Sequence, residues 1–265
     1  MKRISLSKNE YQEICHQLQI NPQKDKKATR ILQNFLKKKY YIPTIKTIRK
    51  MISGKDVLIF APGPTLEKKI EEIGKHKTLE NKTVIAVNGA SQALLQNNIA
   101  SNIIISDLDG SLSALRKNYT KYHSILVIHA HGDNIHLLRK FKENIQKPRV
   151  IGSTQTEETT LVKNYGGFTD GDRAVYFAAN FDAKRIFLLG FDFGYQVGKY
   201  SKPRAESNFQ APPQKEIKFS IAKNLLTKIS KYFPNLPIFT VEPKEKSIPH
   251  LEEITLKEFN KKISE

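Results

Sequence analysis

The chain has 265 residues, of which 39% are hydrophobic, enough for a sizeable core in one large α/β domain or in a core domain with a helical appendage. It has no run of about 18 apolar residues and no apolar secretory signal near its start, so we expect a soluble cytoplasmic protein without a membrane partner. The single cysteine, Cys15, excludes an intramolecular disulfide, and its helix-like surroundings favour a packing role over catalysis.

The formal net charge of +18 is concentrated near the N-terminus, where residues 1–50 contain 13 Lys or Arg and three Asp or Glu. Such an excess raises the question of nucleic-acid binding. It consists mainly of lysine, without a glycine–arginine tract, a zinc-finger spacing or an aromatic RNP-type strand, so a nucleic-acid partner is disfavoured. We interpret it as a solvated helical face whose positive field would attract anionic substrates such as ATP.

Residues 8–50 alternate lysine-rich and apolar positions at helical spacing. We predict a basic helical N-terminal segment over residues 1–53 and an α/β catalytic core over residues 54–265 that ends in a helix, a strand and a tail. One candidate buried stripe of the N-terminal segment contains Ile31, Leu32, Phe35 and Leu36.

In the core, short runs of β-branched residues alternate with helix-like segments, which predicts a Rossmann-like, mostly parallel sheet flanked by helices. Residues 194–214 are rich in Gly, Ser, Pro and Lys, and we predict a mobile loop over the rim of the site. The predicted strands are 56–61, 83–87, 102–106, 124–129, 149–151, 185–190 and 237–241. The predicted helices are 66–75, 91–96, 112–117, 135–143, 172–180 and 217–232.

Five aspartates form three clusters, each beside a glycine and at or near a predicted strand end, where open α/β sheets bind ligands. So many carboxylates would repel one another without cations, and hard oxygen ligands suit Mg²⁺ with phosphates better than zinc or copper. The leading hypothesis from the residues is therefore a Mg²⁺-nucleotide enzyme. The five are Asp107 and Asp109 in SDLDG, Asp133 in HAHGDN, and Asp170 and Asp172 in GGFTDGDR.

The first strand runs into APGPTLE, where Gly63 and Pro64 form a tight turn, with Thr65 as a candidate helix cap. Phosphate could bind there, or the turn could simply connect a strand to a helix. The sequence contains neither GxxxxGK[ST] nor GxGxxG after this strand, which disfavours a P-loop or an ordinary dinucleotide site. Asn88 and Gly89 follow the second strand in the same way, and Gly89 would allow close backbone approach to a ligand.

HAHGDN offers His129, His131, Asp133 and Asn134. The run is similar to those of dinuclear zinc hydrolases, but Asn134 replaces the usual next histidine, so contacts to phosphate or base are favoured. A buried, hydrogen-bonded histidine is the alternative for His129.

The other acidic motifs also have structural alternatives. SDLDG could be an Asx-turn and helix cap. Arg173 could neutralise transferred phosphate or form a surface ion pair. Asp192, after the sixth strand, could cap a turn or reach a substrate.

Taken in order, APGPTLE, SDLDG, HAHGDN and GGFTDGDRA resemble the archaeal 6-hydroxymethyl-7,8-dihydropterin pyrophosphokinase family, which is distantly similar in fold to thiamine pyrophosphokinase. The resemblance spans about Val57 to Tyr195. It implies transfer of pyrophosphate from ATP to the hydroxymethyl group of a reduced pterin, with release of AMP, in tetrahydromethanopterin or folate biosynthesis.

The resemblance also implies roles for individual residues. Asp107 and Asp109 would be catalytic metal ligands, and Asp170 would deprotonate or orient the hydroxyl group. Asp133 and Asp172 would be metal or metal-water partners. His131, Asn134 and Arg173 would meet phosphate, and Gly63, Pro64, Asn88 and Gly89 would line the nucleotide or pterin pocket.

Alternative functions remain open at this point. SDLDG also fits the DxD motif of a nucleotide-sugar glycosyltransferase, and thiamine is the main alternative acceptor within the kinase class. The sequence leaves the oligomeric state open, including a homo-oligomer.

Overall fold

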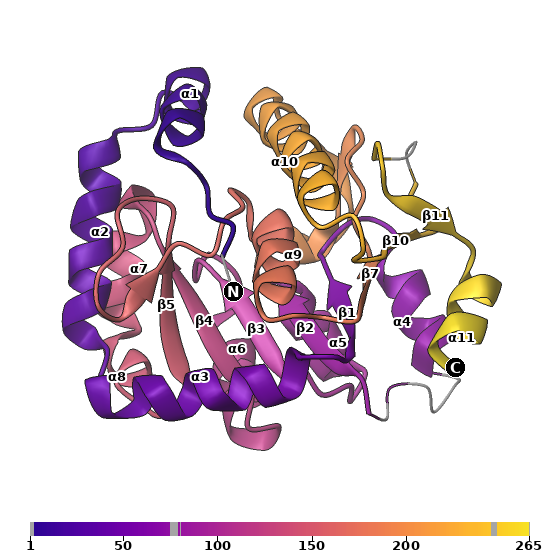
Figure 1. Ribbon diagram of the computed structural model, residues 1–265, viewed down its shortest axis with the longest axis horizontal. Helices are drawn as coiled ribbons and strands as arrows, with labels where there is room; N and C mark the ends of the chain where they lie inside the picture. The colour runs from indigo at the N-terminus through magenta and orange to yellow at the C-terminus, as the bar shows by residue number, and fades with distance from the viewer. Residues whose placement is uncertain (1–2, 75–78, 80, 245–247, 265) are drawn as a thin grey trace.

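The structure is a computed structural model that describes residues 3–74, 79, 81–244 and 248–264. Within these residues, nine strands form one parallel sheet in the order β11-β10-β7-β1-β2-β3-β4-β5-β6 (Figure 1). The predicted mostly parallel α/β fold is therefore confirmed. The strands are β1 (Asp56–Phe60), β2 (Thr83–Val87), β3 (Ile103–Ser106), β4 (Ile125–Ala130), β5 (Val150–Thr154), β6 (Val162–Lys163), β7 (Arg185–Leu189), β10 (Ile238–Val241) and β11 (Glu252–Ile254).

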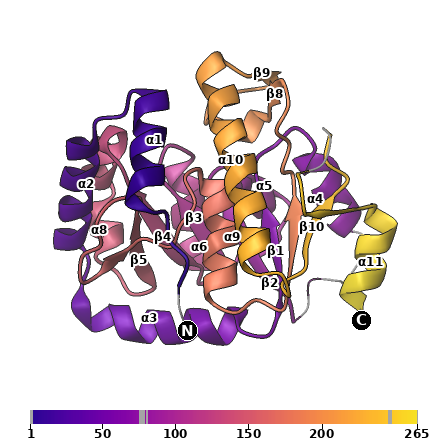
Figure 2. The ribbon, with the colours of Figure 1, turned by 45° about the horizontal axis from the view of Figure 1, so that its top comes forward.

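Helices cover both faces of this sheet. The helices α1, α3, α9 and α10 pack on one face (Figure 2), whereas α4 to α8 and α11 share the core of the other. The helix α2 packs beside β5 and β6. The helices are α1 (Lys8–Leu18), α2 (Pro22–Phe35), α3 (Lys38–Ile52), α4 (Leu66–Gly74), α5 (Ala90–Gln96), α6 (Leu112–Lys121), α7 (Ile135–Lys140), α8 (Lys142–Ile145), α9 (Asp170–Asn180), α10 (Pro213–Tyr232) and α11 (Leu256–Ser264).

The central strands are buried along their whole length, as a parallel sheet with two covered faces requires. Ile59, Ile85, Ile103 and Ile125 lie in one row across β1 to β4 and pack in the core beneath α9. This continuous apolar layer fixes the register of the strands. The polar residues that follow β1, β2, β3 and β4 therefore reach the same edge of the sheet.

The N-terminal segment is helical and packs against the sheet. In the expected stripe, Leu32 and Leu36 are buried, whereas Ile31 and Phe35 are partly covered. Cys15 is a buried free thiol in the core beside α10. None of the helices in the described ranges combines the length and apolar character needed to cross a bilayer.

Several details differ from the sequence prediction. The predicted helix 135–143 is divided at Phe141 into α7 and α8. The strands β6 and β11 and the helix α11 were not predicted, and the last two occupy the expected C-terminal tail. Lys75, the predicted end of α4, lies outside the described residues.

The segment 194–214 forms a small antiparallel pair, β8 (Gln196–Val197) with β9 (Phe209–Gln210), and one turn of 3-10 helix, η2 (Lys199–Ser201), and it lines the site. It therefore covers the rim as expected, while its mobility stays a prediction.

Candidate active site

A cavity of about 570 Å³ opens at the carboxyl edge of the sheet. Its wall includes the residues that follow β1, β2, β3, β4 and β7, the start of α9 and α10, and the junction between α1 and α2. The volume lies within the range typical of small-molecule sites, and the position follows the rule for open α/β sheets.

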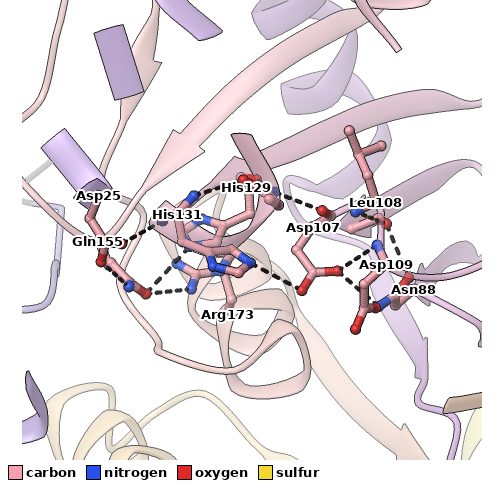
Figure 3. Close-up of polar contacts among 12 residues, drawn as sticks. Asp25, Asn88, Asp107, Leu108, Asp109, His129, His131, Gln155 and Arg173 are labelled. Carbon is pink, nitrogen blue, oxygen red and sulfur yellow. Dashed lines mark hydrogen bonds and ion pairs between the residues drawn. The ribbon is translucent and has the colours of Figure 1, made fainter. Parts of the chain in front are cut away.

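Asp107 and Asp109 lie together on this wall, as predicted. Leu108 between them has a left-handed backbone (φ +73°), which turns the chain sharply after β3. The side-chain amide of Asn88 donates to Oδ1 of Asp107 at 3.0 Å and to Asp109 (Figure 3). The Asp109 amide donates to Asp107 Oδ1 at 3.1 Å, so the Asx-turn is present while both carboxylates line the cavity.

The two carboxylates have opposite pKa shifts. Burial opposes ionisation of Asp107, but the hydrogen bond and charge of His131, whose Nε2 lies 3.3 Å from Asp107 Oδ2, outweigh it and lower the Asp107 pKa well below its ordinary value. Burial and the neighbouring Asp107 charge raise the pKa of Asp109, although Lys202 opposes this shift with an ion pair of 2.9 Å. Asp107 is therefore stabilised in its ionised form by His131, whereas ionised Asp109 is stabilised only by a nearby cation such as Lys202.

Asp170 is the first residue of α9 and also lines the cavity. No hydrogen bond links its carboxylate to any described residue. Burial, then the charges of Asp107 and Asp109, raise its pKa well above the ordinary value, against the opposing charges of Arg173 and Lys215. A carboxyl group with a raised pKa is a stronger base than an ordinary aspartate and so is better suited to accept a proton.

Asp172 does not line the cavity, contrary to its predicted place at a metal. Its side chain is 0% exposed, and its two oxygens accept hydrogen bonds from the amides of Phe168 (2.6 Å) and Thr169 (2.9 Å). Asp172 is therefore the third residue of a capping box at the start of α9. Because both oxygens are engaged, its role is to fix this helix end beside Asp170.

Arg173 does not line the cavity either and is 1% exposed. One of its terminal nitrogens donates to the carbonyl of Phe168 at 2.7 Å, with longer contacts to Gly166 and Gly167. The predicted direct contact with phosphate is therefore not what the structure shows. Arg173 instead holds the glycine-rich turn, and its charge favours ionised Asp170.

The residues of HAHGDN divide between cavity and support. His131 faces Asp107, and the exposed Asp133 lies on the rim. Asn134 is 1% exposed and does not line the cavity; its amide donates to the carbonyls of Asp107 (2.6 Å) and His129 (2.7 Å). Asn134 therefore ties the turn after β4 to the turn after β3 instead of contacting phosphate directly.

His129 is buried, as its structural alternative predicted, and its Nδ1 lies 3.2 Å from the Ser153 hydroxyl. Burial, with smaller repulsion from Arg173 and His131, lowers its pKa well below the ordinary value. In the described part of the chain, no three His, Cys, Asp or Glu side chains converge as a preformed metal site.

The turn after β1 lines the cavity through Gly63 and Pro64, but its amides are not free for phosphate. Ala61 and Gly63 donate to the carbonyls of Leu189 and Gly190. The Thr65 amide donates to Asp192 Oδ2 at 2.8 Å, and the Leu66 amide donates back to Gly63. Asp192 thus caps this turn, as one of its two alternatives predicted, but it also lines the cavity, so contact with a substrate stays a prediction.

Gly89 does not line the cavity. An added Cβ there would collide with the carbonyl oxygen of Tyr200, which belongs to segment 194–214. The close backbone approach predicted at Gly89 is therefore to another part of the chain.

The sequence analysis did not identify Asp25, from α2, among the cavity residues. Asp25 is 2% exposed and accepts hydrogen bonds from the Tyr11 hydroxyl (2.6 Å), the Gly132 amide (2.6 Å) and the Gln155 side chain (2.7 Å) (Figure 3). It is the one aspartate in the first 50 residues. This isolated acid in a basic helix was the signal that could have revealed it.

Four lysines of the cavity wall were also missed: Lys24, Lys202, Lys215 and Lys218. Lysine is so frequent in this chain that no pattern distinguished these four.

Comparison with known proteins agrees with the motif resemblance. The family model described as 6-hydroxymethylpterin diphosphokinase MptE-like matches residues 30–198. A 6-hydroxymethyl-7,8-dihydropterin pyrophosphokinase from Methanocaldococcus jannaschii is 38% identical over 223 residues, which are 82% of this chain and 91% of the relative. A protein of the same name from Pyrococcus furiosus is 36% identical, over 82% of this chain and 89% of the relative.

Among solved structures, the MAf glycosyltransferase from Magnetospirillum magneticum AMB-1 aligns with a TM-score of 0.51. The alignment covers 80% of this chain and 37% of that chain at 14% identity, and so it shows a shared fold alone. The family model, in contrast, matches more than half of this chain, and the two relatives align with most of it at well above 30% identity. The chain therefore belongs to the MptE-like 6-hydroxymethylpterin diphosphokinase family.

Proposed function

We propose that this protein transfers a diphosphate group from ATP to the hydroxymethyl group of 6-hydroxymethyl-7,8-dihydropterin, with Mg²⁺ as the required metal. The observation that carries the proposal is the Asp107–Asp109 pair on the wall of a substrate-sized cavity. Membership of the family and the names of the relatives from Methanocaldococcus jannaschii and Pyrococcus furiosus support the choice of acceptor. The product would serve tetrahydromethanopterin or folate biosynthesis.

The acidic pair fits a magnesium ion. Two adjacent carboxylates repel each other, and the raised pKa of Asp109 is one consequence of that repulsion, added to the effect of burial. Mg²⁺ is commonly held by one or two carboxylates together with substrate phosphates, so a preformed cluster of three protein ligands is not needed. When bound, the metal would neutralise charge on the phosphate oxygens. Asp107 and Asp109 would hold it, and Asp133, which lines the same cavity, would interact with it through water.

The chemistry is an in-line displacement. The hydroxyl oxygen of the pterin attacks the β-phosphorus of ATP and forms a new O–P bond, while the bond to the oxygen that bridges the α- and β-phosphates breaks. AMP leaves with that electron pair. The hydroxyl proton passes to Asp170, whose raised pKa suits it as the acceptor.

Other residues keep the site in its working state. His131 holds Asp107 ionised, and Asn88 orients both carboxylates of the pair. Asn134, Asp172 and Arg173 act as positioning residues, because they fix the turns that carry His131 and Asp170.

The proposal is tested with purified protein, ATP, Mg²⁺ and 6-hydroxymethyl-7,8-dihydropterin, with AMP and the pterin diphosphate ester measured by chromatography. We expect both products in equal amounts, and none when EDTA replaces Mg²⁺. A parallel reaction contains thiamine as the acceptor. Turnover with thiamine alone, or hydrolysis of a nucleotide sugar to a nucleoside diphosphate without any pterin product, would contradict the proposal.

A further inference from the structure

Four lysines line the cavity together with the acidic pair; one, Lys24, comes from α2, and the other three come from the side formed by segment 194–214 and α10. These three are Lys202, from the segment between β8 and β9, and Lys215 and Lys218, from the first two turns of α10. Lys215 and Lys218 are three residues apart and so lie on one side of the helix. The N-terminal end of α10 lies next to the β8–β9 pair (Figure 2), and its positive dipole end adds to their charge.

Lys215 has no counter-ion within the described ranges: no hydrogen bond or ion pair links its ammonium group to another of those residues. The Phe219 ring centroid lies 5.3 Å from Lys215 Nζ, and this aromatic ring carries no negative charge. The charges of Asp109 and Asp170 act on it favourably, but burial dominates and lowers the Lys215 pKa. A cation that is partly removed from water without a partner is costly, so this position is suited to an anionic ligand.

Lys202 has the opposite arrangement, because its ammonium group is paired with Asp109 at 2.9 Å while 60% of its side chain is exposed. A flexible, exposed lysine can exchange partners at little cost. In the absence of a ligand it supplies the positive charge that Asp109 requires.

We propose that Lys202, Lys215 and Lys218 form the binding site for the phosphate chain of the donor nucleotide. Lys215 and Lys218 contact the chain directly, and Lys202 transfers from Asp109 to a phosphate oxygen when the phosphate chain enters, with or without a metal. The backbone amides of the turn after β1 already donate to groups of the protein and so cannot bind phosphate. The three lysines would supply the positive charge that the phosphates need instead. The identity of the donor as ATP rests on the proposed function, whereas the preference for a polyphosphate does not.

Isothermal titration calorimetry in EDTA tests the inference, with ATP and inorganic tripolyphosphate as separate titrants. Lys215→Met should weaken binding of both titrants by about tenfold or more, and Lys202→Met by about threefold. Lys215→Arg, which keeps the charge, should stay within about threefold of the wild type. The matched control is Lys231→Met, an exposed lysine on the same helix and remote from the cavity, with unchanged affinity expected.

Wild-type affinity for tripolyphosphate in both Lys215→Met and Lys202→Met would overturn the inference, as would failure of the wild type to bind tripolyphosphate. If Lys215→Met does not fold by circular dichroism, the exposed Lys202 variant still decides the question. Turnover of the dihydropterin is followed in parallel. Weakened tripolyphosphate binding without any wild-type pterin product would contradict the proposed function alone, whereas normal turnover with unaltered variant affinities would contradict the lysine site alone.

Discussion

The cavity has two kinds of wall, and they differ in how the fold produces them. The acidic wall, with Asp107 and Asp109, follows β3 directly, so the register of the sheet sets its position. The second wall is basic: Lys202 of segment 194–214 and Lys215 and Lys218 of α10 form it, and we call it the lysine wall. Asp25 joins the cavity from α2, which precedes the first strand in the chain. The acidic wall is thus fixed by local sequence, whereas the other parts depend on long-range packing. We expect changes in the first to affect chemistry and changes in the others to affect binding or positioning.

The largest effect is expected at the acidic wall itself. Asp107→Asn removes the carboxylate that His131 keeps ionised, so kcat/KM for pterin diphosphate formation should fall by more than about 1,000-fold. The fold should persist, because Asn can still accept from the Asp109 amide. Asp182→Asn, at a surface ion pair with Arg49, is the control and should keep nearly full activity. Retention of most activity in Asp107→Asn would remove the acidic pair from the chemistry.

The next largest effect is expected at Asp170, where Asp170→Asn should lower kcat but raise Tm at neutral pH. Asp170→Asn should lower kcat by about 100-fold if the carboxylate accepts the hydroxyl proton. Because the folded-state pKa is raised above the unfolded value, the group favours folding when protonated and costs stability once the pH exceeds its ordinary pKa. The variant should therefore have a higher Tm than the wild type at neutral pH, and an unchanged Tm at a pH below that of ordinary carboxylates.

The pH profile of the wild type sharpens this point. Activity should fall as the pH decreases through the raised pKa of Asp170, so the acidic limb of kcat/KM should lie above the ordinary range for aspartate. Lys215→Met removes a charge that opposes the shift and should move this limb to higher pH. If the acidic limb of kcat/KM has the same midpoint in Lys215→Met as in the wild type, the Lys215 charge does not act on the group that titrates there.

The sequence predicted the acidic wall better than the lysine wall, because the acidic wall depends on local sequence and the lysine wall on long-range packing. Strands β1 to β4 were predicted to within one residue at each end, because buried parallel strands are continuous runs of apolar, β-branched residues. The strand β5 continues three residues beyond its predicted end, through Gly152, Ser153 and Thr154. The strands β6 and β11 are two and three residues long, too short for any periodicity. Asp107 and Asp109 line the cavity at the sheet edge where they were predicted, because the strand-end rule needs only local sequence.

The supporting residues show why the remainder could not be predicted. Asp172, Arg173 and Asn134 were expected in the cavity, but they hold the turns beneath it. Asp, Asn and Arg beside a strand end can either cap a turn or bind phosphate. The two roles differ only in the direction of the side chain, which the sequence does not specify. Conversely, Lys215 is one of 44 Lys and Arg residues, and its importance arises from the packing of α10.

Asp25 tests whether α2 belongs to the site. Asp25→Asn places an amide among three donors that now point at a carboxylate, so it should destabilise the protein by about 1–3 kcal/mol. It should also lower kcat/KM by about tenfold, because the Gly132 turn carries His131. Tyr11→Phe removes one of the three hydrogen bonds and serves as the comparison, with a loss of about 1 kcal/mol and near-normal kinetics. Denaturant unfolding and initial rates measure both; equal kinetic effects in the two variants would indicate that Asp25 acts through stability alone.

The smallest effect is expected at Gly89, which lies outside the cavity and packs against the backbone of Tyr200 in segment 194–214. Its φ of −64° suits alanine, so Gly89→Ala should leave α5 and the sheet intact, but the added Cβ would displace the Tyr200 carbonyl and the attached segment from their present position. Because Lys202 lies two residues further along this segment, we expect KM for ATP to rise about threefold to fivefold with kcat nearly unchanged. Gly54→Ala, at a position with open space around it, controls for the general effect of a lost glycine, although its φ of +70° gives it a stability cost of its own. A fall in kcat without a change in KM would mean that segment 194–214 takes part in the chemical step, and the separation between a chemical wall and a binding wall would no longer hold.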